Sequence, residues 1–267
     1  MPRTRDSGES TWPGRLPVVD GTESEVGVGP WEGDRPRGDQ WDPLLLVEGD
    51  RRNVEDRYRY WRHEAIMADL DTRRHDFHVA VENWGHDFNI GSVIRTANAL
   101  GARAFHIVGR RRWNRRGAMV TDRYQHEHHH PSVADLRDWA VSAGGDGHGI
   151  PLIGIDNLPG SMALETYDLP RECVLVFGQE GPGLSAEMRS ACEVVLHITQ
   201  FGSTRSVNAG AAAAIAMHAW VRRHVFSETT EQVSGEVGDD GRVVGAADPG
   251  PLVGVDESGT DPGGQRR

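Results

Sequence analysis

The stretch CVLVFG, residues 173–178, constrains the fold of this chain more than any other. It is an unbroken apolar run of strand-forming residues, and such a run needs cover on both faces, as in the middle of a parallel sheet. Shorter runs of the same kind occur at 77–81, 104–109, 151–155 and 193–198. They alternate with helical patterns, which predicts an α/β domain with a mainly parallel sheet.

The segments between these runs predict helices at 54–70, 89–101, 133–145 and 206–224. The last of them contains Ala211–Ala214, whose small side chains fill little space, so other backbone is expected to pack very close to it. Three hydroxyl residues before it are candidate N-caps: Ser203, Thr204 and Ser206. In parallel α/β sheets ligands bind beyond the carboxyl ends of strands. The loops after 77–81, 151–155, 173–178 and 193–198 are therefore the expected site.

The net charge of −11 resides at the two ends of the chain. Residues 1–50 carry 5 Arg against 11 acids, and residues 227–267 carry 3 Arg against 9 acids. Both ends are rich in Gly and Pro and poor in aliphatic runs, which predicts disorder, although WDPLLLVEGD at 41–50 could pack on the domain edge or lead into the next helix. The expected organisation is a disordered acidic tail (1–50), a helical extension (51–75), the α/β domain (76–226) and a second disordered acidic tail (227–267).

No apolar run approaches the ~18 residues of a membrane span, and the N-terminus lacks an apolar signal core. The two cysteines, Cys173 and Cys192, lie in apolar surroundings, as buried thiols in a reducing compartment do. We therefore expect a soluble, cytoplasmic protein with no membrane partner.

A polar loop and the helix after it form the first candidate site, at residues 82–101. Asn89 follows the strand at 77–81, Gly91 allows backbone to approach closely, and Arg95 lies six residues after Asn89 on the helix. An isolated Arg95 would be read as a solvated helix residue. Its closeness to the end of a strand favours a functional role.

Two further candidate sites follow buried strands. In QEGPGLS, at 179–185, glycines surround Pro182, and Glu180 could bind a hydroxyl group or an arginine. The loop lacks both the Gly-Lys-Ser/Thr ending of a phosphate-binding loop and the Gly-x-Gly-x-x-Gly of dinucleotide sites, which disfavours a dehydrogenase. The third site, FGSTRSVN at 201–208, ends with Ser206 and Asn208 at the start of the last helix.

Together these three stretches resemble the SPOUT RNA methyltransferases, in the SpoU/TrmH branch that methylates ribose 2′-hydroxyls. The resemblance covers roughly residues 77–224. Asn89-x-Gly91-x-x-x-Arg95 is similar to the first family motif, Phe177-Gly178-x-Glu180-x-x-Gly183-Leu184 to the second, and Ile198 through Asn208 to the third. The chain departs from the family where Thr199 replaces the usual Pro and Val207 the usual Leu.

This resemblance implies a deep C-terminal trefoil knot, an exception to the rule that chains are not knotted. It implies S-adenosylmethionine as the cofactor, bound by loops at Ile155, Gly178, Ile198 and Val207. It also implies a homodimer in which Arg95 of one subunit faces the cofactor of the other.

The resemblance implies a catalytic role for Arg95. An arginine stays protonated in proteins and is a poor base. Binding of the adjacent phosphate and stabilisation of the developing alkoxide therefore suit Arg95 better, with proton removal left open. The positioning groups around it would be Asn89, Glu180, Ser206 and Asn208. No metal is required, because the sulfonium is already a good electrophile.

An arginine-rich segment at 110–116 is a candidate RNA contact, because arginines bind phosphates and an aromatic ring stacks on bases. Its members are Arg110, Arg111, Arg112, Trp113, Arg115 and Arg116; a solvated charged loop is the alternative. The histidines at 126 and 128–130 lack the companion cysteines and paired spacing of zinc sites. We expect them on a loop surface, partly cationic near RNA.

The sequence therefore predicts an S-adenosylmethionine-dependent methyltransferase that acts on a ribose 2′-hydroxyl of tRNA or rRNA, with no role on DNA. The short N-terminal extension slightly favours tRNA. The alternatives are methylation of an RNA base and a catalytically silent RNA-binding protein on the same fold. Neither the RNA nor the nucleotide is identified by the sequence.

Overall fold

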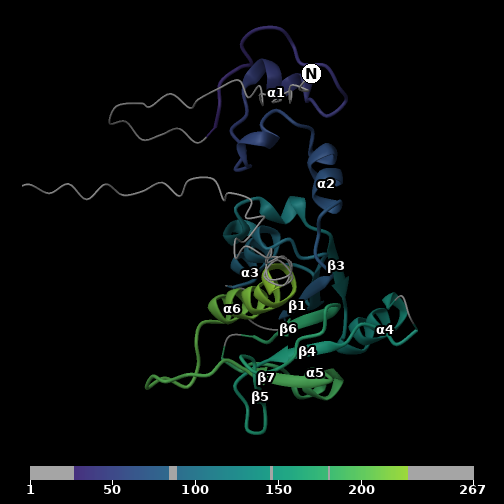
Figure 1. The fold of residues 1–267 in the computed structure, drawn as a ribbon, viewed down its shortest axis with the longest axis vertical. Helices are drawn as coiled ribbons and strands as arrows, with labels where there is room; N and C mark the ends of the chain where they lie inside the picture. Colours follow the sequence, from purple (N-terminus) through teal and green to yellow (C-terminus); the bar gives the residue numbers. More distant parts are fainter. Residues whose placement is uncertain (1–26, 84–88, 145–146, 180, 228–267) are drawn as a thin grey trace, which may run out of the picture.

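One parallel sheet organises the protein. The computed structural model describes residues 27–83, 89–144, 147–179 and 181–227. Within them, the sheet has seven strands in the order β3-β2-β1-β6-β4-β7-β5, and all pairings are parallel (Figure 1). The strands are β1 (Phe77–Asn83), β2 (Phe105–Gly109), β3 (Glu127–His130), β4 (Leu152–Ile155), β5 (Met162–Ala163), β6 (Cys173–Phe177) and β7 (Val194–His197). This confirms the predicted α/β class, while β3 and β5 were not expected.

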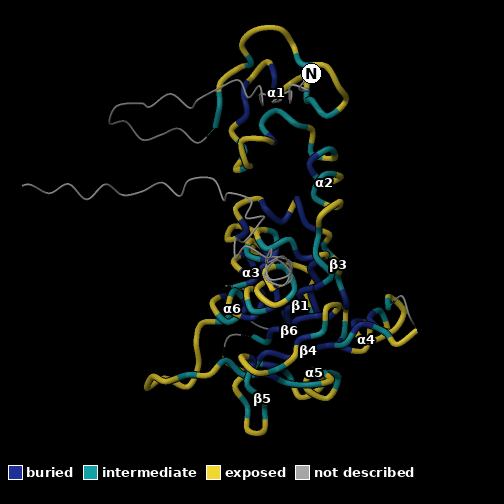
Figure 2. Tube along the Cα trace, viewed as in Figure 1, coloured by how far each residue is buried: buried dark blue, intermediate teal, exposed yellow. Residues whose placement is uncertain are grey.

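Helices cover both faces of the sheet. On one face α3 (Ile90–Ala99) and α6 (Ala209–Val221), which a π-helical turn at Arg222–Phe226 extends, pack over a core that includes Ile94, Met217 and Trp220. On the other face lie α4 (Val133–Ala143) and the short α5 (Ala186–Ala191), which was not predicted. Every residue of β6 is buried between these layers, as its apolar sequence requires (Figure 2).

The strand order determines where a ligand can bind. Strands β1, β6, β4 and β7 are consecutive neighbours and parallel, so their carboxyl ends meet at one edge. The loops after these four strands are the ones the sequence singled out. The fold therefore brings together segments that lie more than 100 residues apart in the chain.

The N-terminal part is folded further than predicted. Residues 43–48 form α1 (Pro43–Glu48), and Asp42 caps its first turn by accepting from the Leu44 amide at 2.8 Å. The expectation of disorder up to residue 50 is therefore wrong for 27–50. The predicted helix at 54–70 is also wrong in its first half. It is a 3₁₀ turn (η1, Asp56–Tyr58), and α2 begins only at His63 and ends at Asp71. Residues 1–26 and 228–267 lie outside the described residues.

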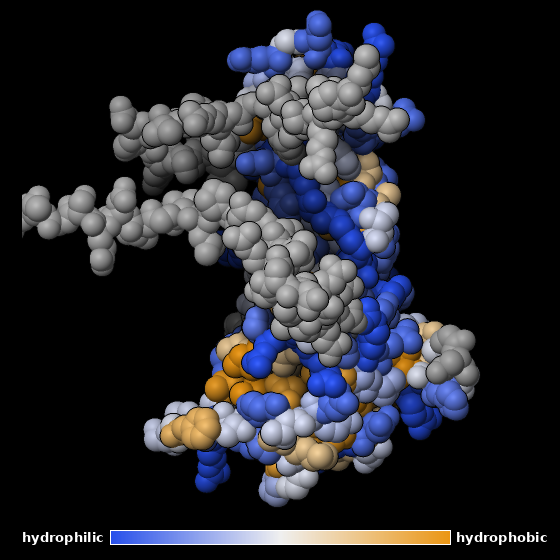
Figure 3. All heavy atoms as spheres, viewed as in Figure 1, coloured by the Kyte–Doolittle hydropathy of each residue, from blue (hydrophilic) through white to orange (hydrophobic). Residues whose placement is uncertain are grey.

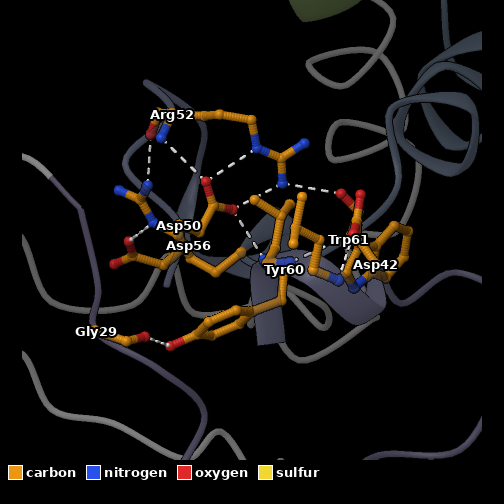
Figure 4. A network of polar contacts seen from close by, with 10 residues as sticks. Gly29, Asp42, Asp50, Arg52, Asp56, Tyr60 and Trp61 are labelled. Atoms are coloured by element: carbon orange, nitrogen blue, oxygen red, sulfur yellow. Dashed lines mark hydrogen bonds and ion pairs between the residues drawn. The ribbon is translucent and has the colours of Figure 1, made fainter. Parts of the chain in front are cut away.

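Asp50 holds this N-terminal part together (Figure 4). Its carboxylate is fully buried and accepts hydrogen bonds from Arg52 Nε (2.9 Å), Arg52 Nη2 (2.7 Å) and the Tyr60 amide (2.9 Å). Burial alone would raise the pKa of Asp50, but the bonds from Arg52 and Tyr60 outweigh it and lower the pKa. Tyr60, in a left-handed conformation with φ 62°, donates its hydroxyl hydrogen to Gly29 O at 2.6 Å. The network thus joins both ends of the segment from 29 to 61.

The histidine-rich stretch forms the edge strand β3 instead of the predicted loop. Across three neighbouring strands, His78 Nδ1 lies 3.0 Å from His106 Nε2, and His106 Nδ1 lies 2.9 Å from His130 Nε2. Trp139 of α4 packs on His106 with ring centroids 4.1 Å apart. Burial lowers the pKa of all three imidazoles, that of His78 to about 4. This histidine ladder (His78, His106, His130) is therefore neutral at pH 7, and the expected cationic role is wrong for His130.

Of the remaining histidines, His126 and His128 are exposed, and His126 lies 2.8 Å from Asp71. Among the described residues no group of three or more His, Cys, Asp and Glu side chains is placed to hold a metal ion. The described part of the chain also contains no helix that is both long and apolar enough to cross a membrane.

Candidate active site at the carboxyl edge of the sheet

A pocket of about 360 Å³ opens at the carboxyl ends of β4, β6 and β7. All four residues expected to contact the cofactor line it: Ile155, Gly178, Ile198 and Val207. Ser206 and Asn208, which were expected to position the nucleotide, also line it. The fold therefore brings six of the predicted site residues to one pocket, from three separate loops, whereas Asn89 and Arg95 do not line it.

The loop after β6 is a tight turn that only glycine permits at two points. Gln179 and Gly183 exchange two backbone hydrogen bonds of 3.0 Å, which closes the turn. A Cβ atom on Gly178 would lie 2.1 Å from the carbonyl carbon of Gly183, and Gly183 itself has φ +71°. Glu180, predicted to act at this site, lies outside the described residues.

Asp156 is a pocket residue that the sequence analysis missed. It follows Ile155 directly, accepts a hydrogen bond from the Leu184 amide (2.9 Å) at Oδ2, and donates its own amide to Leu196 O (2.9 Å). It therefore joins the loops after β4 and β6 to β7. A carboxylate immediately after a buried parallel strand was the available signal.

Buried Glu82 was missed as well. Its Oε2 accepts a hydrogen bond from the Ser185 amide at 2.8 Å, so the end of β1 is tied to the start of α5. It also lines a small cavity next to the pocket, together with Asn89 and Gly178.

The third loop, residues 199–208, is anchored at both ends. Thr199 donates from its amide and from its hydroxyl to Glu165, each at 2.9 Å. Asn157 Nδ2 donates to Arg205 O at 2.9 Å. Thr199, the position where the motif resemblance led us to expect proline, is thus fixed through hydrogen bonds to Glu165.

Asn208 joins the first and third motifs. Its Nδ2 donates to Asn89 Oδ1 at 3.0 Å, and its Oδ1 accepts from the amides of Gly210 (2.9 Å) and Ala211 (3.2 Å). Asn208 is therefore the N-cap of α6, and the predicted caps Ser203, Thr204 and Ser206 are wrong.

The small residues of α6 serve two purposes. A Cβ atom on Gly210 would lie 3.3 Å from Ser92 Cβ of α3, so the two helices are in close contact there. Ala213 and Ala216 are fully buried, whereas Ala212 faces the pocket. Only part of the Ala run therefore meets the expectation of close packing.

Arg95 is exposed on α3, because Ile90, Val93, Ile94 and Ala97 occupy the buried face of this helix. Arg95 is not one of the described residues that line the pocket.

The arginine-rich segment splits into two groups. Trp113 is only 8% exposed and belongs to the core, and the Arg115 guanidinium carbon lies 4.8 Å from the centre of its ring. Arg115 also bonds to Asp122 (2.5 Å) and Glu127 (3.0 Å). The expectation that Trp113 stacks on bases is therefore wrong, because core packing covers the ring. All five arginines of the segment are exposed, but only Arg115 is bonded to Asp122 and Glu127; the others are Arg110, Arg111, Arg112 and Arg116.

A parallel α/β sheet with helices on both faces and a pocket beyond its carboxyl edge is the architecture of cofactor-binding α/β proteins. The chain matches the model of the SpoU rRNA Methylase family over residues 76–218, which is more than half of its length. The protein belongs to this family.

Named relatives agree with this assignment. The chain is 28% identical over 155 residues to the 23S rRNA (uridine(2479)-2′-O)-methyltransferase of Streptomyces viridochromogenes, which covers 53% of this chain and 50% of that protein. It is 31% identical over 146 residues to an uncharacterized tRNA/rRNA methyltransferase of Mycobacterium avium, with 52% and 45% covered. The chain thus spans about half the length of the curated relatives it matches.

Solved structures share the fold. The SpoU methyltransferase AviRb from Streptomyces viridochromogenes, in complex with AdoMet, superposes with a TM-score of 0.53 at 29% identity, over 59% of this chain and 64% of that one. The A. aeolicus TrmH/SpoU tRNA modifying enzyme gives a TM-score of 0.53 at 18% identity, over 67% and 90%, and supports the fold alone.

Proposed function

We propose that this protein transfers a methyl group from S-adenosylmethionine to a ribose 2′-hydroxyl of tRNA or rRNA. The observation that carries the proposal is the convergence of Ile155, Gly178, Ile198 and Val207 on one pocket. Membership in the SpoU rRNA Methylase family and the named 2′-O-methyltransferase relative support the same activity.

The pocket suits the cofactor. Its volume of about 360 Å³ lies within the ~300–1,000 Å³ typical of small-molecule sites. Ile155, Ile198 and Val207 offer apolar walls for an adenine ring. Gly178 has no side chain, so its backbone can contact the cofactor directly. When bound, the sulfonium of S-adenosylmethionine supplies an activated methyl group.

The chain's own residues would orient the RNA. The hydrogen-bonded pair Asn89–Asn208 and the adjacent Ser206 would position the ribose, and Glu180 is proposed to join them. Arg95 would bind the adjacent phosphate and stabilise the alkoxide as the hydroxyl loses its proton. Holding the oxygen in line with the methyl carbon accounts for most of the rate in such a reaction.

The proposed working form is a cytoplasmic homodimer whose C-terminal part is knotted, as the resemblance of the three motifs implies. The absence of Arg95 from the pocket of its own chain supports action on the partner's pocket. Arg110, Arg111, Arg112 and Arg116 are proposed to bind RNA phosphates, and Trp113 and Arg115 to hold this segment in place.

The test uses total RNA from a strain that lacks the gene and radiolabelled S-adenosylmethionine. The parent should label a ribose 2′-oxygen, identified by nucleoside analysis. Arg95→Ala should reduce the rate at least ~100-fold, since one stabilising donor contributes about that much, while the Kd for S-adenosylmethionine changes less than about twofold. Label on a base would establish base methylation instead, and absence of cofactor binding in calorimetry would indicate a silent RNA-binding protein.

A further inference from the structure

The loop between β7 and α6 carries an unusually exposed aromatic residue. Phe201 is 96% exposed, and the next most exposed large hydrophobic residue of the described chain is Val141 at 64%. The loop projects from the body of the protein and has a hydrophobic tip (Figures 1 and 3). A phenyl ring in solvent gives up the free energy of burial, so an exposed ring at a candidate site is a candidate contact for a ligand.

The two anchors of this loop make its position definite. Thr199 is bonded to Glu165 on one side of Phe201, and Arg205 O is bonded to Asn157 on the other. Gln200 before Phe201 and Ser206 after Arg205 both line the pocket. Phe201 is therefore adjacent to the pocket rim, because it directly follows Gln200 in the chain.

The chemistry of the loop favours a nucleotide over an apolar partner. Between Thr199 and Val207 the one charged residue is Arg205, which is exposed, and the others around Phe201 are polar or glycine. An aromatic face binds a base by stacking, and an arginine a few residues away binds a phosphate. A contact with a second copy of the chain would call for a broader apolar surface around the ring.

We propose that Phe201 stacks on an unpaired base of the RNA substrate beside the reacting ribose, and that Arg205 binds a phosphate of the same strand. This inference rests on the proposed function and narrows its substrate to RNA with an unpaired nucleotide at the target site. Stacking tolerates any base, so the loop would hold the strand without reading its sequence.

The experiment compares Phe201→Ala, Phe201→Trp and Arg205→Gln with the parent, with total RNA from the deletion strain as the substrate. Phe201→Ala should raise the KM for RNA about tenfold or more, which is the range measured for the loss of one stacked base. Phe201→Trp should restore the parent KM, because it keeps a stacking face. Arg205→Gln should raise KM and lower the salt slope by about one, with the backbone anchor at residue 205 retained.

The controls separate stacking from folding and from cofactor binding. The Kd for S-adenosylmethionine should stay within about twofold of the parent in all three variants. Val141→Ala removes exposed apolar surface on α4, at the opposite side of the molecule, and should leave KM unchanged (Figure 1).

Two results would overturn the inference. An active parent with an unchanged RNA KM in Phe201→Ala would remove the stacking role and leave the proposed function intact. A shift of Phe201→Ala from dimer to monomer in light scattering would assign the ring to a contact between copies. Failure of the parent itself to methylate RNA would instead contradict the proposed function, on which the inference rests.

Discussion

At the residue scale, the backbone around Gly178 leaves no space for a side chain. A Cβ atom on Gly178 would lie 2.1 Å from Gly183 C and 2.3 Å from Leu184 N. These are backbone atoms of the turn that borders the pocket, and they cannot rotate away as a side chain could. The turn can therefore form this pocket wall only because Gly178 lacks a Cβ atom.

We expect Gly178→Ala to weaken S-adenosylmethionine binding at least ~10-fold and to lower the Tm, because overpacking at this turn costs ~1–3 kcal/mol. Calorimetry and thermal unfolding measure the two effects. Gly202→Ala is the matched control in the neighbouring loop, since a Cβ there meets nothing within 4 Å. Equal cofactor affinity in Gly178→Ala and the parent would contradict the assigned pocket wall.

The two ends of the Asn208 amide have different roles: Oδ1 caps α6, and Nδ2 binds Asn89. Asn208→Asp keeps the oxygen that accepts from Gly210 and Ala211 but replaces the amide that donates to Asn89. We expect the free energy of unfolding of Asn208→Asp to stay within ~0.5 kcal/mol of the parent value, while most methyl transfer is lost. Asn208→Ala should lose methyl transfer and also the ~1 kcal/mol of stability that a helix cap contributes. Urea unfolding and RNA labelling distinguish the two losses. Full activity in Asn208→Asp would leave the bond to Asn89 without a role.

At the scale of elements, the histidine ladder links three strands to α4. His78, His106 and His130 lie on β1, β2 and β3, and Trp139 of α4 packs on the middle ring. Each neutral imidazole has one donor and one acceptor, which matches the two bonds of His106. A proton added to His106 would place two donors against its neighbours and break the match.

The ladder should make stability depend on pH. The pKa of His78 is lowered to about 4 by burial, so below its ordinary value of 6.5 the unfolded chain takes up a proton that the folded chain refuses. The free energy of unfolding is therefore highest above pH 6.5 and falls as the pH drops towards 4. Between pH 7.5 and pH 5 His78 alone contributes a loss of about 2 kcal/mol.

Urea unfolding at pH 7.5, 6 and 5 checks this dependence. His78→Asn, which places an amide near Nδ1 and does not titrate, should flatten the pH dependence. The exposed His218→Asn on α6 should keep the parent's dependence. A parent-like pH profile in His78→Asn would contradict the contribution of His78.

At the scale of the whole molecule, the proposed function involves two chains. The pocket contains the residues proposed to bind the cofactor and Ala212, whereas Arg95 is exposed on α3 and does not line it. If Arg95 acts on the partner's pocket, the unit of catalysis is the dimer, and each subunit contributes a different part of both sites.

Complementation between two inactive variants tests this arrangement. Ala212→Leu should fill the pocket and block cofactor binding, and Arg95→Ala should remove the arginine proposed to act in catalysis. Co-expression with different affinity tags yields a mixed dimer in which the intact pocket faces the intact arginine. Purified mixed dimers should regain activity that neither variant has alone. Inactive mixed dimers would place Arg95 in its own subunit's site.

Part of this protein could be predicted from local sequence. The apolar run at 173–178, its glycine loop and the motifs around Asn89, Ile198 and Asn208 indicate a parallel sheet and a pocket, and the structure agrees. These features are readable because strand burial and glycine turns act over a few neighbouring residues.

Other features depended on contacts between segments distant in sequence. The amide of Tyr60 is held by Asp50, which breaks the predicted helix. EHHH forms a strand because its backbone pairs with β2, where His130 also bonds to His106. Trp113 resembles an RNA contact in sequence, but the core covers its ring. Sequence alone determined the class of fold and which loops form the pocket. Tertiary structure decided which polar residues are buried. The free energy of burying each polar group depends on hydrogen-bond partners that lie 10 to more than 100 residues away in the chain.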